Sequence, residues 1–174
     1  MLDITGGVGG SNTPVPELEE WKKSIETNLT GPILMSQNRL PMFRNSPNRE
    51  HGGIIIHMSS TRAHQSEPDS EGYATTKAGL IGLTHSMAVS LATLGITVNA
   101  VLPGWIDVSN ECKEADGQWE DELNQEDHLQ PLSGRAGNVE DILRTVEYLS
   151  GARFITGTEQ IVDGGVTRKM VYPE

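Results

Sequence analysis

Residues 53–58 read Gly-Ile-Ile-Ile-His-Met, a short apolar run that is rich in β-branched side chains and does not alternate with polar ones. Such a run is typical of a strand that is covered on both faces, as in a parallel sheet. It is followed by two serines, Ser59 and Ser60, and by a polar stretch that extends to Gly72.

Helices and strands alternate outward from this run. We expect three helices and two further strands, at residues 17–39, 73–94 and 139–149 and at residues 96–101 and 159–163, respectively. Gly31-Pro32 is expected to kink or divide the first helix, and Asn138 to cap the last one. The alternation predicts an α/β fold with a parallel sheet. The length of 174 residues fits a single domain over residues 1–174.

The expected helices carry patterned side chains. The apolar stripes run along Leu18, Trp21, Ile25, Leu29 and Ile33 in the first helix and Ile142, Val146 and Leu149 in the last. The middle helix carries many small residues, which let it pack closely on a sheet or another helix: Ala74, Ala78, Gly79, Gly82, Ala88 and Ala92.

Composition excludes several classes of protein. A net charge of −11 repels phosphate backbones and anionic membranes, so we expect no nucleic-acid partner and no membrane association. The single cysteine, Cys112, cannot pair within the chain, and no Cys/His spacing suits a metal, so none is predicted. Without an apolar leader after Met1, and with a lone thiol, the sequence favours a soluble cytoplasmic protein.

The stretch that carries chemistry is Met58-Ser59-Ser60, twelve further residues, and then Tyr73-Ala-Thr-Thr-Lys77. Residues four apart at the start of a helix lie on one face. A lysine ammonium there favours the phenolate form of tyrosine, so the pair can give and take a proton. A serine at the end of the preceding strand can hydrogen-bond a substrate oxygen. The Tyr-x-x-x-Lys spacing alone is weak, because an exposed tyrosine stacked on a lysine stem gives it too.

In combination these residues resemble the short-chain dehydrogenase/reductase family, including the spacing of thirteen from Ser60 to Tyr73. Asn28 resembles the family's helix asparagine, which supports a proton-relay water. Residues 95–106 (GITVNAVLPGWI) are similar to the strand and Pro-Gly turn that contact the nicotinamide end of the cofactor. The C-terminal segments LSGRAGNVEDI, FITGTEQIVDGG and TRKMVY are also similar, so the resemblance covers residues 17–174.

The resemblance implies a Rossmann-like, doubly wound parallel sheet and hydride transfer between NAD or NADP and an alcohol or carbonyl substrate. Tyr73 would donate or accept the proton, and Lys77 would hold the nicotinamide ribose and tune Tyr73. Ser60 would orient the substrate oxygen, and Asn28 would connect the relay to solvent. The implied cofactor contacts are Tyr73, Lys77, Pro103, Gly104 and Ile106. A homo-oligomer, dimer or tetramer, would form through the helices that carry Tyr73 and Asn28.

Two features depart from the family. The family begins with a strand and a TGxxxGxG loop that binds the pyrophosphate. The run TGGVGG at residues 5–10 lacks a preceding strand and is followed by Pro14 and Pro16, so we align it with the loop after the family's fourth strand. The chain is then expected to be N-terminally truncated by on the order of 80–90 residues, which would leave a formerly central strand at an edge of the sheet and bare one side of the core. Val108 stands where the family often has a threonine that meets the carboxamide.

Alternatives remain open at this point. The chain is either an NAD(P)-dependent oxidoreductase or a catalytically silent relative that binds no dinucleotide and acts as an oligomer partner or regulator. A serine hydrolase using His57 or His64 is disfavoured, because no GxSxG elbow is present. The segment at residues 107–130 is polar and strongly acidic. Its stretch at residues 111–127 is either a solvated face or, as in the family, a lid over the substrate, lined by Trp105 or Trp119.

Overall fold

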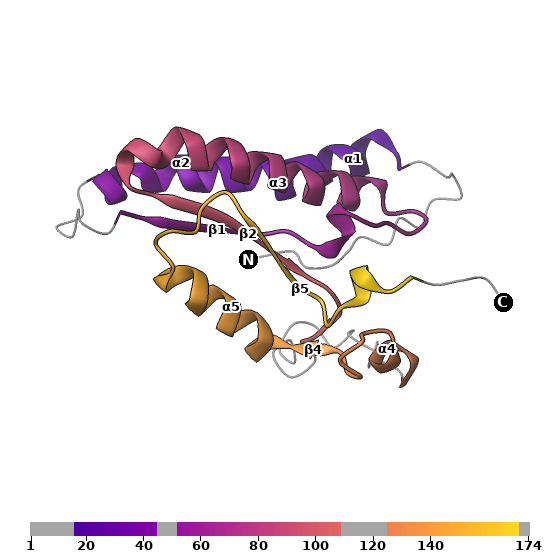
Figure 1. The fold of residues 1–174 in the computed structure, drawn as a ribbon. Helices are drawn as coiled ribbons and strands as arrows, with labels where there is room; N and C mark the ends of the chain where they lie inside the picture. Colours follow the sequence, from indigo (N-terminus) through magenta and orange to yellow (C-terminus); the bar gives the residue numbers. More distant parts are fainter. Residues whose placement is uncertain (1–15, 45–51, 109–124, 171–174) are drawn as a thin grey trace.

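The computed structural model describes residues 16–44, 52–108 and 125–170, and Figure 1 shows the arrangement of their helices and strands. Three parallel strands form the main sheet in the order β1-β2-β5: β1 (Ile54–Met58), β2 (Thr97–Pro103) and β5 (Glu159–Val162). Helices α1, α2 and α3 lie on one face of this sheet, and α5 lies on the other (Figure 1). The predicted Rossmann-like α/β fold, with helices on both faces of a parallel sheet, is confirmed.

The register of the sheet brings the carboxyl ends of its strands to one edge. His57 lies opposite Ala100, and Ala100 lies opposite Glu159. A second, two-stranded parallel sheet follows β2 directly and joins β3 (Ile106–Asp107) to β4 (Gly137–Asn138). Loops that leave this edge can therefore meet around a common site.

The strands differ in how deeply they are buried. Within β2 the side chains of Val98, Val101 and Leu102 are fully buried. The three isoleucines of β1, in contrast, are half-buried. Among the described residues β1 pairs only with β2, so it is an edge strand of the described sheet. The isoleucines of β1 are thus less buried than the expected strand covered on both faces would be, whereas His57 in the same strand is buried.

The first predicted helix is divided in three. Helix α1 (Leu18–Ile25) continues into a π-helical turn (Glu26–Thr30), and α2 (Gly31–Arg44) follows. The division falls at Gly31-Pro32, as predicted, because proline has no N–H to continue the α-helical ladder. In the π-helical turn the N–H of Gly31 bonds instead to the carbonyl of Glu26, five residues earlier. The two ends of the predicted apolar stripe, Leu18 and Ile33, are exposed.

Helix α3 (Glu71–Leu91) packs closely against the first helical segment, and a 3-10 turn (Ala92–Leu94) ends it. A Cβ atom on Gly79 would lie 3.0 Å from the Leu29 side chain, and one on Gly72 would lie 3.0 Å from the Ser24 hydroxyl. The predicted role of small residues in close packing is thus confirmed at Gly79. Gly82 faces away, with no atom within 4 Å of an added Cβ.

Helix α5 (Val139–Gly151) begins at the predicted cap. The Asn138 side chain accepts the N–H of Asp141, and the Asp141 side chain accepts the N–H of Asn138, which completes a capping box. Ile142 and Val146 are half-buried and Leu149 is fully buried, so the predicted stripe faces the sheet.

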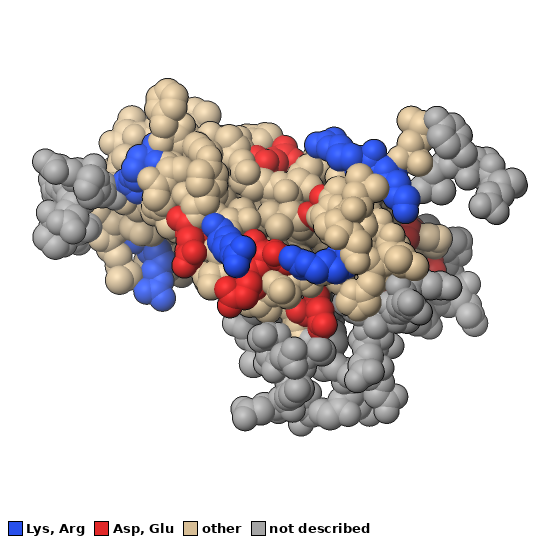
Figure 2. All heavy atoms as spheres, turned by 60° about the horizontal axis from the view of Figure 1, so that its bottom comes forward, with Lys and Arg blue, Asp and Glu red and all other residues tan. Residues whose placement is uncertain are grey.

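Parts of the predicted acidic segment at residues 107–130 are described: β3 begins it, and helix α4 (Gln125–Leu129) lies at its end. Cys112, Trp119 and the glycine run at residues 5–10 lie outside the described residues. On the face in Figure 2, Lys and Arg side chains are interspersed with Asp and Glu side chains. In the part of the chain that the structure describes, no helix has both the length and the apolar character needed to cross a bilayer.

Candidate active site

Tyr73 and Lys77 lie one turn apart in the first part of α3, on the face that their spacing predicted. The Nζ of Lys77 lies 5.2 Å from the centroid of the Tyr73 ring. Lys77 is only 5% exposed, whereas Tyr73 is half-buried and remains accessible. A buried lysine cation and an accessible phenol thus lie side by side on α3.

Two contacts with the end of β1 hold Lys77 in place. Its ammonium donates to the carbonyl of Met58 at 3.0 Å, and its own carbonyl accepts the hydroxyl of Ser59 at 2.8 Å. Burial lowers the pKa of Lys77, because a charged ammonium loses hydration. An ammonium has three N–H donors, and within the described residues the Met58 carbonyl is its hydrogen-bond acceptor. The site therefore retains donors for a bound hydroxyl group.

Ser60 is the second residue after β1 and is 8% exposed. Its side chain caps the 3-10 turn Thr61–Ala63 by accepting the N–H of Arg62 at 3.2 Å. Arg62 in turn forms an ion pair with Glu67, within the loop that leads to Tyr73. Because the Ser60 oxygen acts as an acceptor in the cap, its own O–H remains able to donate to a substrate oxygen.

Asn28 lies in the π-helical turn and reaches α3 through its side chain. Its Nδ2 donates to the Thr76 hydroxyl at 3.2 Å, and that hydroxyl donates to the carbonyl of Tyr73 at 2.8 Å. The residue four positions after Asn28 is Pro32, which has no N–H, so the Asn28 carbonyl cannot receive the usual α-helical bond. Sequence reasoning missed Thr76 and Ser59, since no spacing rule marks a buried hydroxyl that supports its neighbour.

Pro103, Gly104 and Ile106 lie where β2 ends, at the edge of the sheet that also carries Ser60. The N–H of Gly104 bonds to the carbonyl of Val162 at 2.9 Å. A Cβ on Gly104 would lie 2.9 Å from Cα of Asp163, so the close approach of β5 already requires glycine here. Contacts of these three residues with a cofactor remain predictions.

Asp163 organises the turn after β5. Its carboxylate accepts the N–H groups of Gly165 and Thr167, both at 2.8 Å, and the Thr167 hydroxyl at 2.7 Å. Burial raises the pKa of Asp163, but the hydrogen bonds from Thr167 and Gly165 outweigh it, so the pKa is lowered overall. The turn therefore holds an ionised carboxylate close to the Pro-Gly segment.

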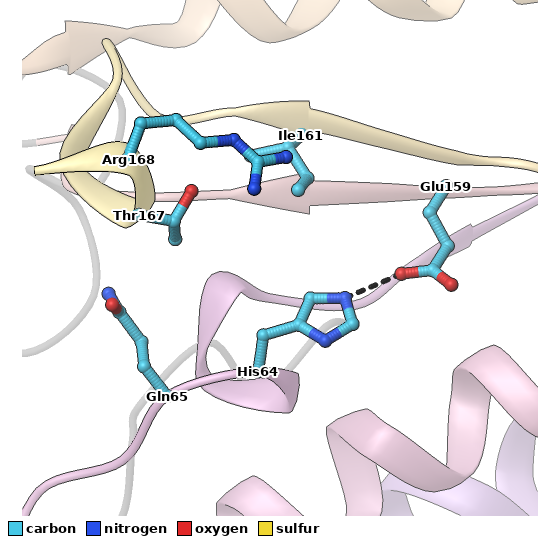
Figure 3. A pocket seen from close by; sticks show the side chains of 6 residues that line it. All are labelled: His64, Gln65, Glu159, Ile161, Thr167 and Arg168. Atoms are coloured by element: carbon cyan, nitrogen blue, oxygen red, sulfur yellow. Dashed lines mark hydrogen bonds and ion pairs between the residues drawn. The ribbon is translucent and has the colours of Figure 1, made fainter.

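A pocket of about 470 Å³ lies beside the loop that follows Ser60, as Figure 3 shows. It is lined by His64, Gln65, Glu159, Ile161, Thr167 and Arg168, and by none of the predicted catalytic side chains. The Glu159 carboxylate lies 2.6 Å from Nε2 of His64 and 3.7 Å from Nε2 of His85. In the described part of the chain no group of His, Cys, Asp or Glu side chains is arranged to hold a metal ion.

The histidine next to the two serines is a core residue. Nδ1 of His57 lies 2.8 Å from the Thr84 hydroxyl, and His57 is 5% exposed. Burial lowers the pKa of His57, which favours its neutral form. Ser59 and Ser60 hydrogen-bond backbone groups and, within the described residues, bond to no histidine, so the geometry supports no serine hydrolase.

Comparison with known proteins identifies relatives of this chain. A family model described as enoyl-(acyl carrier protein) reductase matches residues 8–167. An uncharacterized oxidoreductase of Thermotoga maritima is 46% identical over 160 residues, which cover 90% of this chain and 60% of that protein. A solved structure of an apo SCOR enzyme from Clostridium thermocellum has a TM-score of 0.75 and 37% identity, covering 90% of this chain and 57% of that one.

A solved structure of 4-hydroxyisoleucine dehydrogenase complexed with NADH has a TM-score of 0.73 and 29% identity, and the match covers 88% of this chain and 62% of that one. The chain thus spans 57–62% of the length of these three relatives. The range that matches the family model, residues 8–167, contains Ser60, Tyr73 and Lys77. The chain belongs to the short-chain dehydrogenase/reductase family of oxidoreductases.

Proposed function

We propose that this protein transfers a hydride between NAD or NADP and a small alcohol or carbonyl substrate. The observation that carries the proposal is the Lys77 ammonium, which is 5% exposed and lies 5.2 Å from the Tyr73 ring. Burying a lysine costs free energy, and no carboxylate pairs with this one among the described residues. Such a lysine is typical of a functional site rather than of a structural one.

A nicotinamide dinucleotide, when bound, would supply or accept the hydride. The Tyr73 phenol would give its proton to the carbonyl oxygen during reduction and take it from the alcohol during oxidation. The Ser60 hydroxyl would donate a hydrogen bond to the same oxygen, since its cap contact with Arg62 leaves its proton available. Lys77 would hold the nicotinamide ribose beside Tyr73, and Asn28 would connect this group to solvent.

The residues fit the ribose of such a cofactor. Because one protein acceptor serves the three N–H groups of Lys77 in the described structure, the ammonium retains donors for ribose hydroxyls. Pro103, Gly104 and Ile106 would contact the nicotinamide end from the neighbouring strand end. That the 4-hydroxyisoleucine dehydrogenase relative was solved with NADH supports this class of cofactor. The choice between NAD and NADP is part of the test.

We also propose that the chain is cytoplasmic and forms a homo-oligomer, dimer or tetramer, through α3 and the helical segment around Asn28. On α3 the exposed residues Ala78, Gly82 and Val89 would permit close approach of a second copy. These small or apolar side chains support the proposed contact between two copies. Sedimentation velocity of the purified chain measures its oligomeric state. A monomer at all concentrations would contradict it.

The first test of the proposed activity is whether the chain binds the nucleotide cofactor. The purified 174-residue chain is titrated with NADH and with NADPH, followed by nucleotide fluorescence, and the same titration is done with Lys77→Ala. We expect saturation at micromolar concentrations and a loss of at least about tenfold in Lys77→Ala, because a charged hydrogen bond to ribose is removed. Lys22→Ala is the matched control, since Lys22 is half-exposed on α1 and, among the described residues, pairs with Glu19 alone.

Turnover is then measured as NADH or NADPH oxidation with ethyl acetoacetate as the carbonyl probe. Tyr73→Phe should abolish turnover and leave nucleotide binding within a few-fold, because only the proton donor is removed. A well-folded chain that binds neither nucleotide up to millimolar concentration would contradict the proposal. It would favour the catalytically silent relative, acting as an oligomer partner or regulator.

A further inference from the structure

In the described structure Thr76 is the only side chain that hydrogen-bonds both the Asn28 side chain and the backbone of Tyr73. Thr76 is fully buried. Its hydroxyl accepts a hydrogen bond from Nδ2 of Asn28 at 3.2 Å and donates one to the carbonyl of Tyr73 at 2.8 Å. A hydroxyl has a single proton, so the donation to Tyr73 leaves the oxygen lone pairs to face Asn28. Both bonds therefore depend on the same oxygen atom.

The π-helical turn is the part of the site that needs such a support. Proline at position 32 removes an N–H from the ladder, and Gly31 bonds to Glu26 with π-helical spacing. Single π-helical turns are inserted into α-helices frequently at functional sites. The close packing of Gly79 on Leu29 brings this turn against α3, within reach of the Thr76 hydroxyl.

We propose that Thr76 is a positioning residue that fixes Asn28 relative to Tyr73 through this shared hydroxyl. The inference rests on the proposed hydride transfer, and it adds a residue that is neither a proton donor nor a cofactor contact. The Thr76 methyl group cannot replace the hydroxyl in this role, because both contacts are hydrogen bonds. Removal of the hydroxyl would leave the Asn28 amide without its acceptor on α3.

Thr84 provides a matched control on the same helix. It is also fully buried, and its hydroxyl donates to the carbonyl of Leu80 at 2.7 Å and contacts Nδ1 of His57. Loss of the Thr84 hydroxyl therefore breaks two hydrogen bonds, as loss of the Thr76 hydroxyl does. In the described structure the Thr84 hydroxyl bonds to Leu80 and His57 and not to Asn28, Tyr73 or Lys77. An effect limited to Thr76 would separate positioning from general stability.

The test compares Thr76→Val, Thr76→Ser and Thr84→Val with the unmodified chain. With NADH and ethyl acetoacetate, Thr76→Val should lower kcat by about tenfold and leave KM within about twofold, because the reacting groups are misplaced while the substrate still binds. Thr76→Ser keeps the hydroxyl and should restore kcat. Thr84→Val should lose thermal stability to a similar extent and keep kcat within about twofold.

A second measurement does not require turnover. In a ¹⁵N–¹H spectrum the Asn28 side-chain amide, assigned by its disappearance in Asn28→Asp, should shift and exchange faster in Thr76→Val than in Thr84→Val. An unchanged Asn28 amide in Thr76→Val overturns the proposal, and so does an unchanged kcat. If the unmodified chain turns over no substrate, the proposed function fails, and the amide signal still decides whether Thr76 holds Asn28.

Discussion

The ammonium of Lys77 donates a hydrogen bond to the carbonyl oxygen of Met58, at an Nζ–O distance of 3.0 Å. The contact joins the first turns of α3 to the end of β1, nineteen residues earlier in the chain. A hydrogen bond to a carbonyl replaces only part of the hydration that a buried ammonium loses. Lys77 is therefore held in its place at a cost to the stability of the fold.

This cost predicts that Lys77→Met stabilises the protein. Methionine has a similar length and no charge to desolvate, so we expect the free energy of unfolding to rise by about 1 kcal/mol. Urea denaturation at pH 7.5 measures it. Lys22→Met, on the exposed side of α1, should change stability by less than about 0.5 kcal/mol. A Lys77→Met protein less stable than the unmodified chain would show that the Met58 contact outweighs desolvation.

The same burial predicts a dependence on alkaline pH. Because the pKa of Lys77 is lowered in the folded protein, the unfolded chain binds more protons between that pKa and 10.5. Stability relative to Lys77→Met should therefore rise as pH increases through this window. Urea midpoints of the two proteins at pH 7.5 and 9.5 test the trend. A stability difference that widens as pH rises would contradict it.

His57 predicts a loss of stability in mild acid. Burial lowers the pKa of His57 below 6.5, so below that pH the unfolded chain takes up a proton that the folded chain refuses. Between pH 7.5 and 5.5 this linkage removes up to about 1.4 kcal/mol. His57→Gln should flatten this part of the pH profile, whereas His85→Gln should retain it. An unaltered profile in His57→Gln would exclude His57 as the source.

Substitution of alanine for Gly104 and for Gly82 is expected to change the stability of the protein in opposite directions. In Gly104→Ala the new methyl group would lie 2.8–2.9 Å from Cβ and Cα of Asp163, so the backbone must shift. We expect a loss of about 2 kcal/mol in stability. Gly82→Ala places its methyl group in open space within α3 and should stabilise the protein by up to about 1 kcal/mol. Thermal unfolding compares the two, and equal effects would contradict the packing.

The capping box predicts the effect of changing Asn138. Asn138→Ala leaves the N–H of Asp141 without its acceptor, and we expect a loss of about 1 kcal/mol, whereas Asn138→Ser should retain most of the stability. Hydrogen bonds from Arg135 and from the Asn138 backbone lower the pKa of Asp141 to about 2. The contribution of that carboxylate is present above pH 3.8 and is lost as pH falls from 3.8 to about 2. Chemical denaturation of both variants at pH 7 measures the cap, and an Asn138→Ala protein of unchanged stability would contradict it.

Much of this protein is determined by its sequence alone, because the deciding interactions are local. Four-residue spacing places Tyr73 and Lys77 on one face of any helix, and the missing N–H of Pro32 interrupts the first helix wherever it packs. Asn138 and Asp141 cap α5 with atoms only three residues apart. The family resemblance rested on these same short patterns and is confirmed.

Only the tertiary structure decided which distant groups meet. The order β1-β2-β5 sets Glu159 beside His64 and leaves the isoleucines of β1 half-buried at an edge. The bond between Asn28 and Thr76 joins residues 48 positions apart. Contacts of this kind depend on the order of the strands and on how closely the helices pack. The periodicity of side chains in the sequence determines neither of these. The sequence thus specifies the reactive pair, and packing specifies what supports it.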